Sequence, residues 1–172
     1  VRLSPFDRRV VDIRFFDGQG RNLSKNAERN IERVFFREDF RRVYLDDIGT
    51  IEYAPQVVET YVRDFLQVVD ADAIRRAHFR IVVYYAFAPT GEVLPQILSQ
   101  LGVEVVPLAS NVEGDKMSLS QQEFEKELRE VTLITGVLDA QLGVRLDVGG
   151  EKIFLVDHHG QYVPETAAAG AM

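Results

Sequence analysis

The sequence predicts a layered α/β fold, with helices on both sides of a mixed, mainly parallel sheet. Residues 79–108 alternate as strand, helix and strand, which is the length and order of a βαβ unit with parallel strands. A helix with a clear N-terminal signal follows from Ser120. Two short apolar segments around a glycine turn, within residues 143–157, then complete the sheet as a strand pair.

The first third of the chain predicts one strand and one helix, followed by a second helix. Residues 13–16 form a short apolar run that ends in a glycine turn at residues 17–20. Ser24 is suited to cap a helix, because apolar residues recur at helical spacing up to Phe35. The second helix begins near Pro55, and its apolar stripe over residues 57–69 indicates core packing.

The rest of the chain predicts a nearly complete α/β domain. Residues 79–85 form a buried strand, Thr90 is expected to cap the next helix, and Gly102 is expected to end it. Residues 103–108 form the next strand. Ser120 and Glu123 form a capping box for a helix whose apolar face includes Val131. We place a domain boundary between residues 51 and 52, so that residues 1–51 and 52–172 belong to two domains.

Composition excludes several classes of function. The 172 residues carry 20 Lys and Arg against 27 Asp and Glu, a net charge of −7, which argues against a nucleic-acid partner. There is no cysteine, so neither a disulfide nor a thiolate metal site can form. No apolar run approaches the roughly 18 residues of a membrane span. No signal-peptide pattern precedes the first strand, so we expect a cytoplasmic protein cut from a longer polypeptide.

The turn between the last two strands is the strongest candidate for chemistry. It contains two carboxylates, Asp147 and Glu151, separated by Gly149 and Gly150 and followed by Lys152. A glycine turn that presents carboxylates at the end of a strand suits a hard cation, because Mg²⁺ prefers oxygen ligands at short distance. The competing interpretation is an ordinary β-turn with solvated charges.

This window resembles the metal loop of the alpha-D-phosphohexomutases, the phosphoglucomutase and phosphomannomutase family. That loop reads Asp-x-Asp-x-Asp-Arg before an apolar strand, and here the frame reads Asp147, Gly149, Glu151 and Lys152. The preceding Ala140-Gln141-Leu142-Gly143 is similar to the family's Ala-Asp-Leu-Gly. Further similarity covers residues 81–88 and Leu101-Gly102-Val103-Glu104-Val105, which resemble a strand and a helix end of the family's second domain.

The beginning of the chain resembles the end of the family's first domain. There the family's serine loop is followed by an apolar strand and a glycine turn, and here Ser4 aligns with the phosphoserine that transfers phosphate. The family's His-Asn-Pro after the serine is Pro5-Phe6-Asp7 in this chain. The resemblance therefore implies residues 1–51 as the C-terminal part of domain I and residues 52–172 as domain II, both of phosphohexomutase type.

The resemblance also implies an activity, a cofactor and a partner. Ser4 would be the catalytic residue, Asp147 and Glu151 metal ligands for Mg²⁺, and Lys152 a phosphate contact, with a mannose or glucose phosphate as substrate. The loss of one Asp at Gly149, and the changes to Glu151 and Lys152, imply a degenerate site. Chains with such a loop resemble the mutase-like half of fusions with a mannose-1-phosphate guanylyltransferase.

Two alternatives stay open on the sequence. In the first, Ser4 is the phosphate carrier of a divergent mutase. In the second, Ser4 is an ordinary loop serine, and the chain is a catalytically silent module that binds a sugar phosphate or mediates assembly of its parent protein. Formation of a homo-oligomer is also open. His158 and His159 follow the last long strand. We expect these histidines to be exposed turn residues that point apart, as adjacent side chains do on an extended chain. We expect Arg8 and Arg9 to be solvated surface residues, with contact to a phosphate near Ser4 as the alternative.

Overall fold

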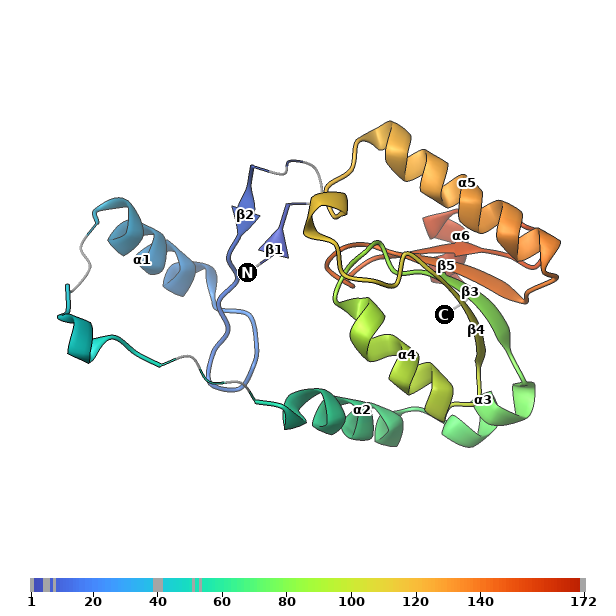
Figure 1. Ribbon diagram of the computed structural model, residues 1–172, viewed down its shortest axis with the longest axis horizontal. Coiled ribbons are helices and arrows are strands. Elements are labelled where there is room, and N and C mark those ends of the chain that lie inside the picture. Colours follow the sequence, from blue (N-terminus) through green and yellow to red (C-terminus); the bar gives the residue numbers. More distant parts are fainter. Residues whose placement is uncertain are drawn as a thin grey trace. The chain divides into compact units, whose positions relative to one another are not determined.

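The computed structural model describes residues 2–4, 7, 9–38, 42–50, 52 and 54–170. The chain divides into two compact units, one of residues Asp12–Ala54 and one of Arg2–Val11 together with Pro55–Met172. The second unit holds the main sheet and the helices drawn from green to red in Figure 1. The boundary between residues 51 and 52, and its assignment to two domains of one family, stay predictions.

The larger unit is built on a five-stranded sheet with the order β4-β3-β5-β6-β7. β3 (Arg80–Tyr84) is parallel to both β4 (Glu104–Leu108) and β5 (Leu142–Leu146). β6 (Ile153–Val156) and β7 (Tyr162–Val163) continue the sheet in antiparallel pairs. The parallel strands are joined by long helical crossovers, whereas tight turns suffice for the antiparallel ones. The layered, mixed sheet predicted from the sequence is confirmed.

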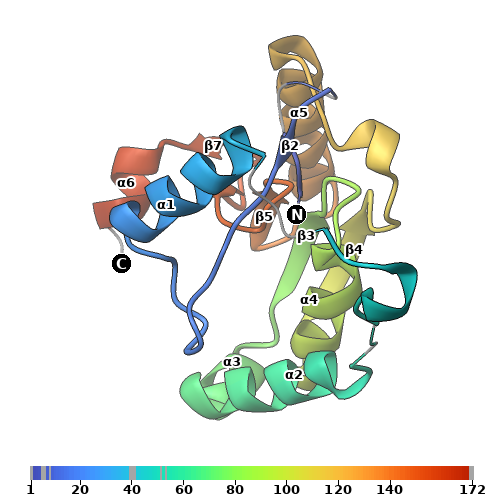
Figure 2. The same ribbon diagram turned by 90° about the vertical axis from the view of Figure 1, so that its left-hand side faces the viewer.

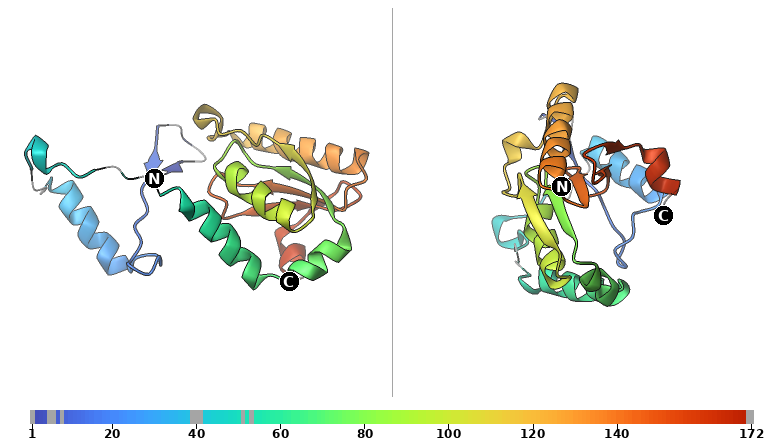
Figure 3. Two further views of the ribbon diagram at one scale, coloured as in Figure 1. Left: turned by 60° about the horizontal axis from the view of Figure 1, so that its bottom comes forward. Right: turned by 90° about the vertical axis from the view of Figure 1, so that its right-hand side faces the viewer.

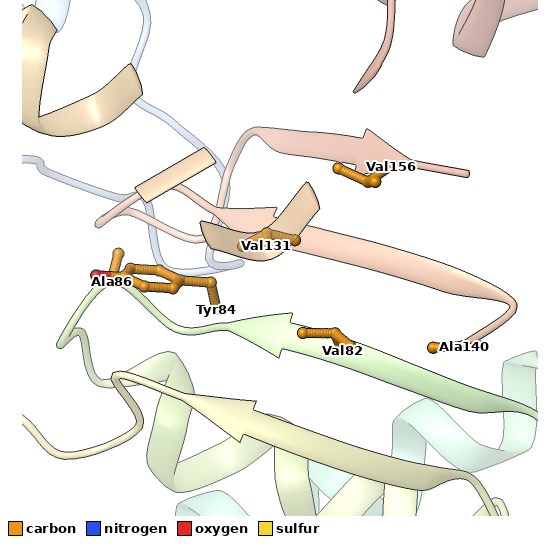
Figure 4. Packing of buried hydrophobic residues seen from close by; sticks show 6 residues of the cluster. All are labelled: Val82, Tyr84, Ala86, Val131, Ala140 and Val156. Carbon is orange, nitrogen blue, oxygen red and sulfur yellow. The ribbon is translucent and has the colours of Figure 1, made fainter. Parts of the chain in front are cut away.

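One face of the sheet is covered by α5 (Gln121–Val137). Alternate residues of β3 point to this face, and Val131 from the middle of the helix is fully buried against them. Figure 4 shows this packing through the side chains of Val82, Tyr84, Ala86, Val131, Ala140 and Val156.

The other face is covered by α4 (Thr90–Gln100), so the two helices lie on opposite sides of the sheet (Figure 1). Ile81, Val83 and Tyr85 of β3 and its end pack there with Leu94 and Leu98. The helix α2 (Gln56–Val68) lies beside α4, away from the sheet (Figures 2 and 3). Its buried Val62 packs with Ile97 and Leu101. The predicted core packing of residues 57–69 is therefore confirmed in part: Val62 is buried with Val58, Phe65, Leu66 and Val69 packed beside it, whereas Val57 and Tyr61 are more than half exposed.

Three helix starts were predicted from capping residues, and those at Ser24 and Ser120 are correct, whereas that at Thr90 is not. At α5 the Glu123 N–H donates to Ser120 Oγ at 3.3 Å and the Ser120 N–H donates to Glu123 Oε2 at 2.8 Å, which confirms the capping box. At α4 the cap position is Pro89, whose φ of −57° and ψ of −16° are already helical, and Thr90 is the first helical residue. Thr90 is therefore not the cap, because a capping side chain needs extended backbone to reach back to the helix.

Most of the remaining short helices and turns of the larger unit were not predicted from the sequence. α3 (Ala71–Ala77) begins at Asp70, whose side chain accepts from the Ala73 N–H at 2.9 Å. A 3-10 turn, η2 (Gly114–Lys116), precedes α5. The alanine-rich segment near the end of the chain forms helix α6 (Glu165–Gly170). No helix among the described residues is long and apolar enough to cross a membrane.

In the smaller unit the predicted strand at residues 13–16 is wrong. The nearby strand pair is formed by β1 (Arg2–Leu3) and β2 (Val11–Asp12), which belong to the larger unit except for Asp12, and Phe16 makes only an isolated bridge to Asn22. The apolar run therefore has no neighbouring strand among the described residues. α1 (Lys25–Phe36) begins as expected, with Ser24 Oγ accepting from the Ala27 N–H at 3.3 Å. A 3-10 turn, η1 (Leu45–Asp47), follows.

Replacing Asp139 with glycine is expected to stabilise the protein. Asp139 follows α5 at a φ of +53°, in the left-handed region, and its N–H and that of Ala140 donate back to the last turn of the helix. Relief of the left-handed strain should exceed the entropy that glycine adds to the unfolded chain, for a net gain of about 0.5 kcal/mol. Urea unfolding measures this difference.

The control is the same position of α4, where Gly102 has a φ of +68°. A Cβ there would meet only Arg75 Cγ, at an ordinary 3.6 Å, so Gly102→Ala tests the backbone alone. It should destabilise by about 1 kcal/mol. A gain at Asp139→Gly together with a loss at Gly102→Ala would support the strain argument, and a neutral Gly102→Ala would contradict it.

Candidate functional site

The candidate carboxylates lie in the loop between β5 and β6, at the carboxyl end of β5. Asp147 is half-buried, whereas Glu151 and Lys152 are exposed. The loop lies against the start of α4: Gly150 has a φ of +66°, and a Cβ on it would lie 2.8 Å from Thr90 Cγ2. Glycine is thus required at this position both for its conformation and for the close approach.

One oxygen of Asp147 is bound by its own loop. Oδ1 accepts from the backbone N–H groups of Glu151, at 2.6 Å, and of Lys152, at 2.9 Å. The backbone of Asp147 also accepts from the Gly150 N–H and donates to the Lys152 carbonyl, each at 3.0 Å. An Asp side chain that holds the following backbone in this way is a frequent way to build a tight turn.

The same arrangement occurs at two other turns of this chain. Asp157 Oδ1 accepts from the His159 and Gln161 N–H groups, each at 2.9 Å, between β6 and β7. Asp17 Oδ1 accepts in the same way at 2.8 and 2.9 Å in the smaller unit. The Gln161 N–H, with that of His159, holds the pKa of Asp157 below its usual range. The Asp147 loop thus has the hydrogen bonding of a structural turn.

The donor set does not fit the magnesium site that the sequence resemblance implies. Mg²⁺ needs near-octahedral oxygen coordination. In the part of the chain that the structure describes, no three His, Cys, Asp or Glu side chains converge so that they could hold a metal ion. Gly149 contributes no side-chain oxygen, and one Asp147 oxygen already accepts two N–H groups.

Ser4 lies in the larger unit, in a turn between β1 and β2. Its N–H donates to the Val10 carbonyl at 3.0 Å, and its carbonyl accepts from the hydroxyl of Ser118, a buried residue of the connection between β4 and α5. The arginine of this turn that the structure describes, Arg9, is paired with Asp7 at 2.9 Å. Pro5, Phe6 and Arg8 lie outside the described residues. The alignment of Ser4 with a phosphoserine stays a prediction.

The two histidines are exposed turn residues, as expected, but they do not point apart. The rings of His158 and His159 lie side by side, with centroids 3.7 Å apart and planes tilted by 43°. The reason is the turn held by Asp157, because its backbone is not extended and adjacent side chains no longer alternate.

Sequence reasoning missed a buried ion pair beside the loop. Arg145, two residues before Asp147, is buried, and its Nη2 and Nε donate to Glu127 Oε2 of α5 at 2.7 and 3.2 Å. The side chains are 3% and 11% exposed. A signal was present, since Glu127 falls between Phe124 and Val131 at the spacing of the buried helix face.

Aromatic rings surround the guanidinium of Arg145. Its Cζ lies 4.3 Å from the ring centroid of Phe124 and 5.8 Å from those of Tyr84 and Phe154. Burial, followed by the charge of Glu127 and a hydrogen bond to it, raises the pKa of Tyr84 above its ordinary value. The phenol therefore stays protonated, and the charged pair packs among aromatic rings and is largely removed from water.

Asparagine at position 147 is expected to preserve the loop, because its side-chain oxygen can accept the same two N–H groups. Asp147→Asn should lower the free energy of unfolding by less than about 1 kcal/mol, and Asp147→Ala by about 1–2 kcal/mol. The matched pair Asp157→Asn and Asp157→Ala should show the same order. An asparagine variant at 147 that unfolds as readily as the alanine variant would point to a role that needs the charge.

Known proteins similar to this chain are phosphohexose mutases. The family model described as "Phosphoglucomutase/phosphomannomutase, alpha/beta/alpha domain II" matches residues 59–160. The chain is 26% identical over 151 residues to a phosphoglucomutase/phosphomannomutase of Thermococcus kodakarensis, covering 88% of this chain and 33% of that protein. It is 29% identical over 150 residues to a phosphoglucosamine mutase of Marinomonas sp., covering 86% and 32%. The chain thus spans about a third of the length of the curated relatives it matches.

Among solved structures, the fold is similar to that of a phosphoglucomutase/phosphomannomutase family protein from Burkholderia thailandensis. The TM-score is 0.61 at 16% identity, over 82% of this chain and 29% of that one. The likeness agrees with the sheet order and the helices on its two faces. The match over residues 59–160 carries the assignment, and the chain belongs to the phosphoglucomutase/phosphomannomutase family.

Proposed function

We propose that this chain is part of a phosphomutase-lineage protein of hexose-phosphate and nucleotide-sugar metabolism whose phosphoserine and magnesium loops are degenerate. The observation that carries the proposal is the hydrogen bonding of Asp147, one oxygen of which accepts two N–H groups of its own turn. The same turn recurs at Asp157 and Asp17, where the resemblance implies no metal. The hydrogen bonds that hold the turn are therefore enough to explain why an Asp stands at position 147.

The other implied residues support the same proposal. Gly149 supplies no ligand, Glu151 is one methylene longer than the Asp of the family's loop, and Lys152 cannot form the two-pronged contact of an arginine. Ser4 is the residue proposed to have carried phosphate in the lineage. The sugar is proposed only as a hexose phosphate, because the relatives include mutases of glucose, mannose and glucosamine phosphates by their names.

Magnesium titration of the native protein beside a loop-restored variant tests the proposal. In isothermal titration calorimetry, Gly149→Asp/Glu151→Asp is expected to bind Mg²⁺ at least about ten-fold more tightly than the native chain, because it restores two short carboxylates. Asp147→Asn in the restored variant is the control and should abolish the gain. Native binding as tight as that of the variant would show that the loop is still a metal site.

The activity of the full-length protein is the second readout. Incubation with the 1-phosphates of mannose, glucose and glucosamine, with Mg²⁺ and glucose 1,6-bisphosphate, is expected to give no 6-phosphate product. Mass spectrometry should find no phosphate on Ser4. Turnover at an ordinary enzymatic rate, with Ser4 phosphorylated, would overturn the degenerate site and favour an active divergent mutase.

A silent assembly module is the second candidate, and the exposure of α1 favours it. No residue of α1 is buried, and Phe35 and Phe36 are 59% and 80% exposed. In this alternative the chain assembles with the rest of a polypeptide, such as a mannose-1-phosphate guanylyltransferase half. Formation of GDP-mannose from mannose 1-phosphate and GTP by the full-length protein would support the fusion, and a full-length protein without that activity would contradict it.

A further inference from the structure

A second place in the larger unit has the position of a ligand site. β3 continues into α4 and β4 continues into α5, and these helices lie on opposite faces of the sheet. In open α/β sheets, ligands bind outside the carboxyl ends of neighbouring strands whose connections leave to opposite faces. The carboxyl ends of β3 and β4 form such a point, on the α5 side of the sheet and not in the Asp147 loop.

The backbone at this point is strained. Ala86 and Phe87, after β3, both have a φ of +55°, and Ala109, after β4, has a φ of +48°. The two strand ends are held together, since the Phe87 N–H donates to the Ala109 carbonyl at 2.9 Å. Non-glycine residues in the left-handed region are unfavourable, and such strain concentrates at binding sites.

A cavity of about 230 Å³ opens at these strand ends. Phe87 and the buried Tyr84 line it with rings that pack edge to face, and Lys116 Nζ lies 4.7 Å from the centroid of the Phe87 ring. Lys116 and Leu119, from the connection to α5, form one wall. The N-terminal half of α5 forms the opposite wall with charged side chains. The volume suits a molecule of amino-acid or monosaccharide size.

Most charges around the cavity are already used by the fold. Lys116 pairs with Glu113 at 2.7 Å, Glu127 binds Arg145, and Glu123 caps α5. Two exposed charges remain, Lys126 and Glu130, one turn apart on α5. Within the described ranges, neither of these two side chains has a hydrogen bond or an ion pair. The cavity thus presents one ammonium and one carboxylate over aromatic surface.

We propose that this cavity binds a small molecule that carries both an anionic group and an ammonium group. Lys126 receives the anion, Glu130 receives the ammonium, and the body of the ligand lies against the half-buried Phe87 and Leu119. A ligand of one charge sign would satisfy one of these two side chains and be repelled by the other. An amino-sugar phosphate and an amino acid share this chemistry. The proposal is independent of the Asp147 loop, and so of whether that loop binds Mg²⁺.

Two-charge and one-charge probes test the proposal with the full-length protein, with three hexoses on one scaffold and L-glutamine as the amino-acid probe. Glucosamine 6-phosphate and L-glutamine are the two-charge probes, and glucose 6-phosphate and glucosamine each lack one charge. Calorimetry is expected to give at least one two-charge probe a Kd about ten-fold or more below those of both single-charge probes. NMR shifts of the Tyr84 and Phe87 ring protons should accompany the binding. The tighter of the two probes identifies the source of the ligand.

Matched variants on α5 separate the cavity from general electrostatics. Lys126→Ala and Glu130→Gln should each weaken binding about ten-fold, whereas Arg129→Ala and Glu125→Gln, the same charges outside the cavity, should change it less than about two-fold. All four residues are exposed, so the fold should tolerate the changes. The proposal is overturned if no two-charge probe binds, if a single-charge probe binds equally well, or if the outside variants weaken binding as much.

Discussion

Glu127→Gln is expected to lower the free energy of unfolding by about 3 kcal/mol or more, one of the two largest single effects in this chain. Glutamine has the shape of glutamate, so the change leaves no cavity. It removes the charge that balances Arg145, whose side chain is 3% exposed and lies among the rings of Phe124, Phe154 and Tyr84. An uncompensated guanidinium in this environment is far less stable than in water. Urea unfolding at neutral pH measures the difference.

Two controls separate the buried charge from the loss of an ion pair as such. Arg80 and Glu104 pair at 2.8 Å across β3 and β4, but their side chains are 46% and 62% exposed. Glu104→Gln should therefore change stability by less than about 1 kcal/mol. The double variant Arg145→Met/Glu127→Gln removes both buried charges and should recover most of the loss. A double variant as unstable as Glu127→Gln alone would contradict the explanation.

Local signals predicted the sheet and most of its helices because each depends on neighbouring residues. The capping box at Ser120, the stop at Gly102 and the alternation along β3 are readable within a few positions. Thr90 failed because the preceding Pro89 is already helical. The predicted strand at residues 13–16 failed because a strand also needs a partner, and the nearby pairing uses Val11 and Asp12 instead.

The candidate site shows a different limit. The sequence places Asp147, Gly149 and Glu151 in one turn and predicts how the metal loop has degenerated. It does not show where the oxygens of Asp147 point, because this depends on the backbone geometry that Gly150 permits at a φ of +66°. The hydrogen bonding that Asp17, Asp147 and Asp157 share is seen only when the structures of the three turns are compared.

The Arg145–Glu127 pair could not be predicted from neighbouring residues either, because it also depends on the three-dimensional arrangement of the chain. Eighteen positions separate the two residues, and they meet because α5 crosses β5 on one face of the sheet. A charged residue at a buried spacing in a helix, and another within an apolar strand, are each explained most simply as a surface residue. Taken together on facing elements they indicate a pair, and this inference requires the topology first.

Gly143→Ala is the second large effect, an expected loss of about 2–3 kcal/mol of unfolding free energy. Gly143 is buried in β5 and faces Thr135 and Val131 of α5. A Cβ on it would lie 2.3 Å from Thr135 Oγ1 and 3.0 Å from both Val131 Cγ1 and Val156 Cβ. Thr135, Val131 and Val156 are fully buried, so none can move aside without displacing the helix or the sheet. Thermal and urea unfolding should show the loss.

Thr135 supplies the decisive control for this contact. Its Oγ1 is buried without a hydrogen-bond partner among the described residues, so Thr135→Ala alone should be close to neutral. In the background of Gly143→Ala the same change removes the atom of closest approach and should recover about half of the loss or more. At Gly136 on α5 the nearest atom to an added Cβ is Gly160 Cα, at an ordinary contact distance of 3.8 Å. Gly136→Ala should therefore stabilise the helix by about 0.5–1 kcal/mol. Absence of rescue by Thr135→Ala would mean that Val131 and Val156, rather than the hydroxyl, set the spacing between α5 and β5.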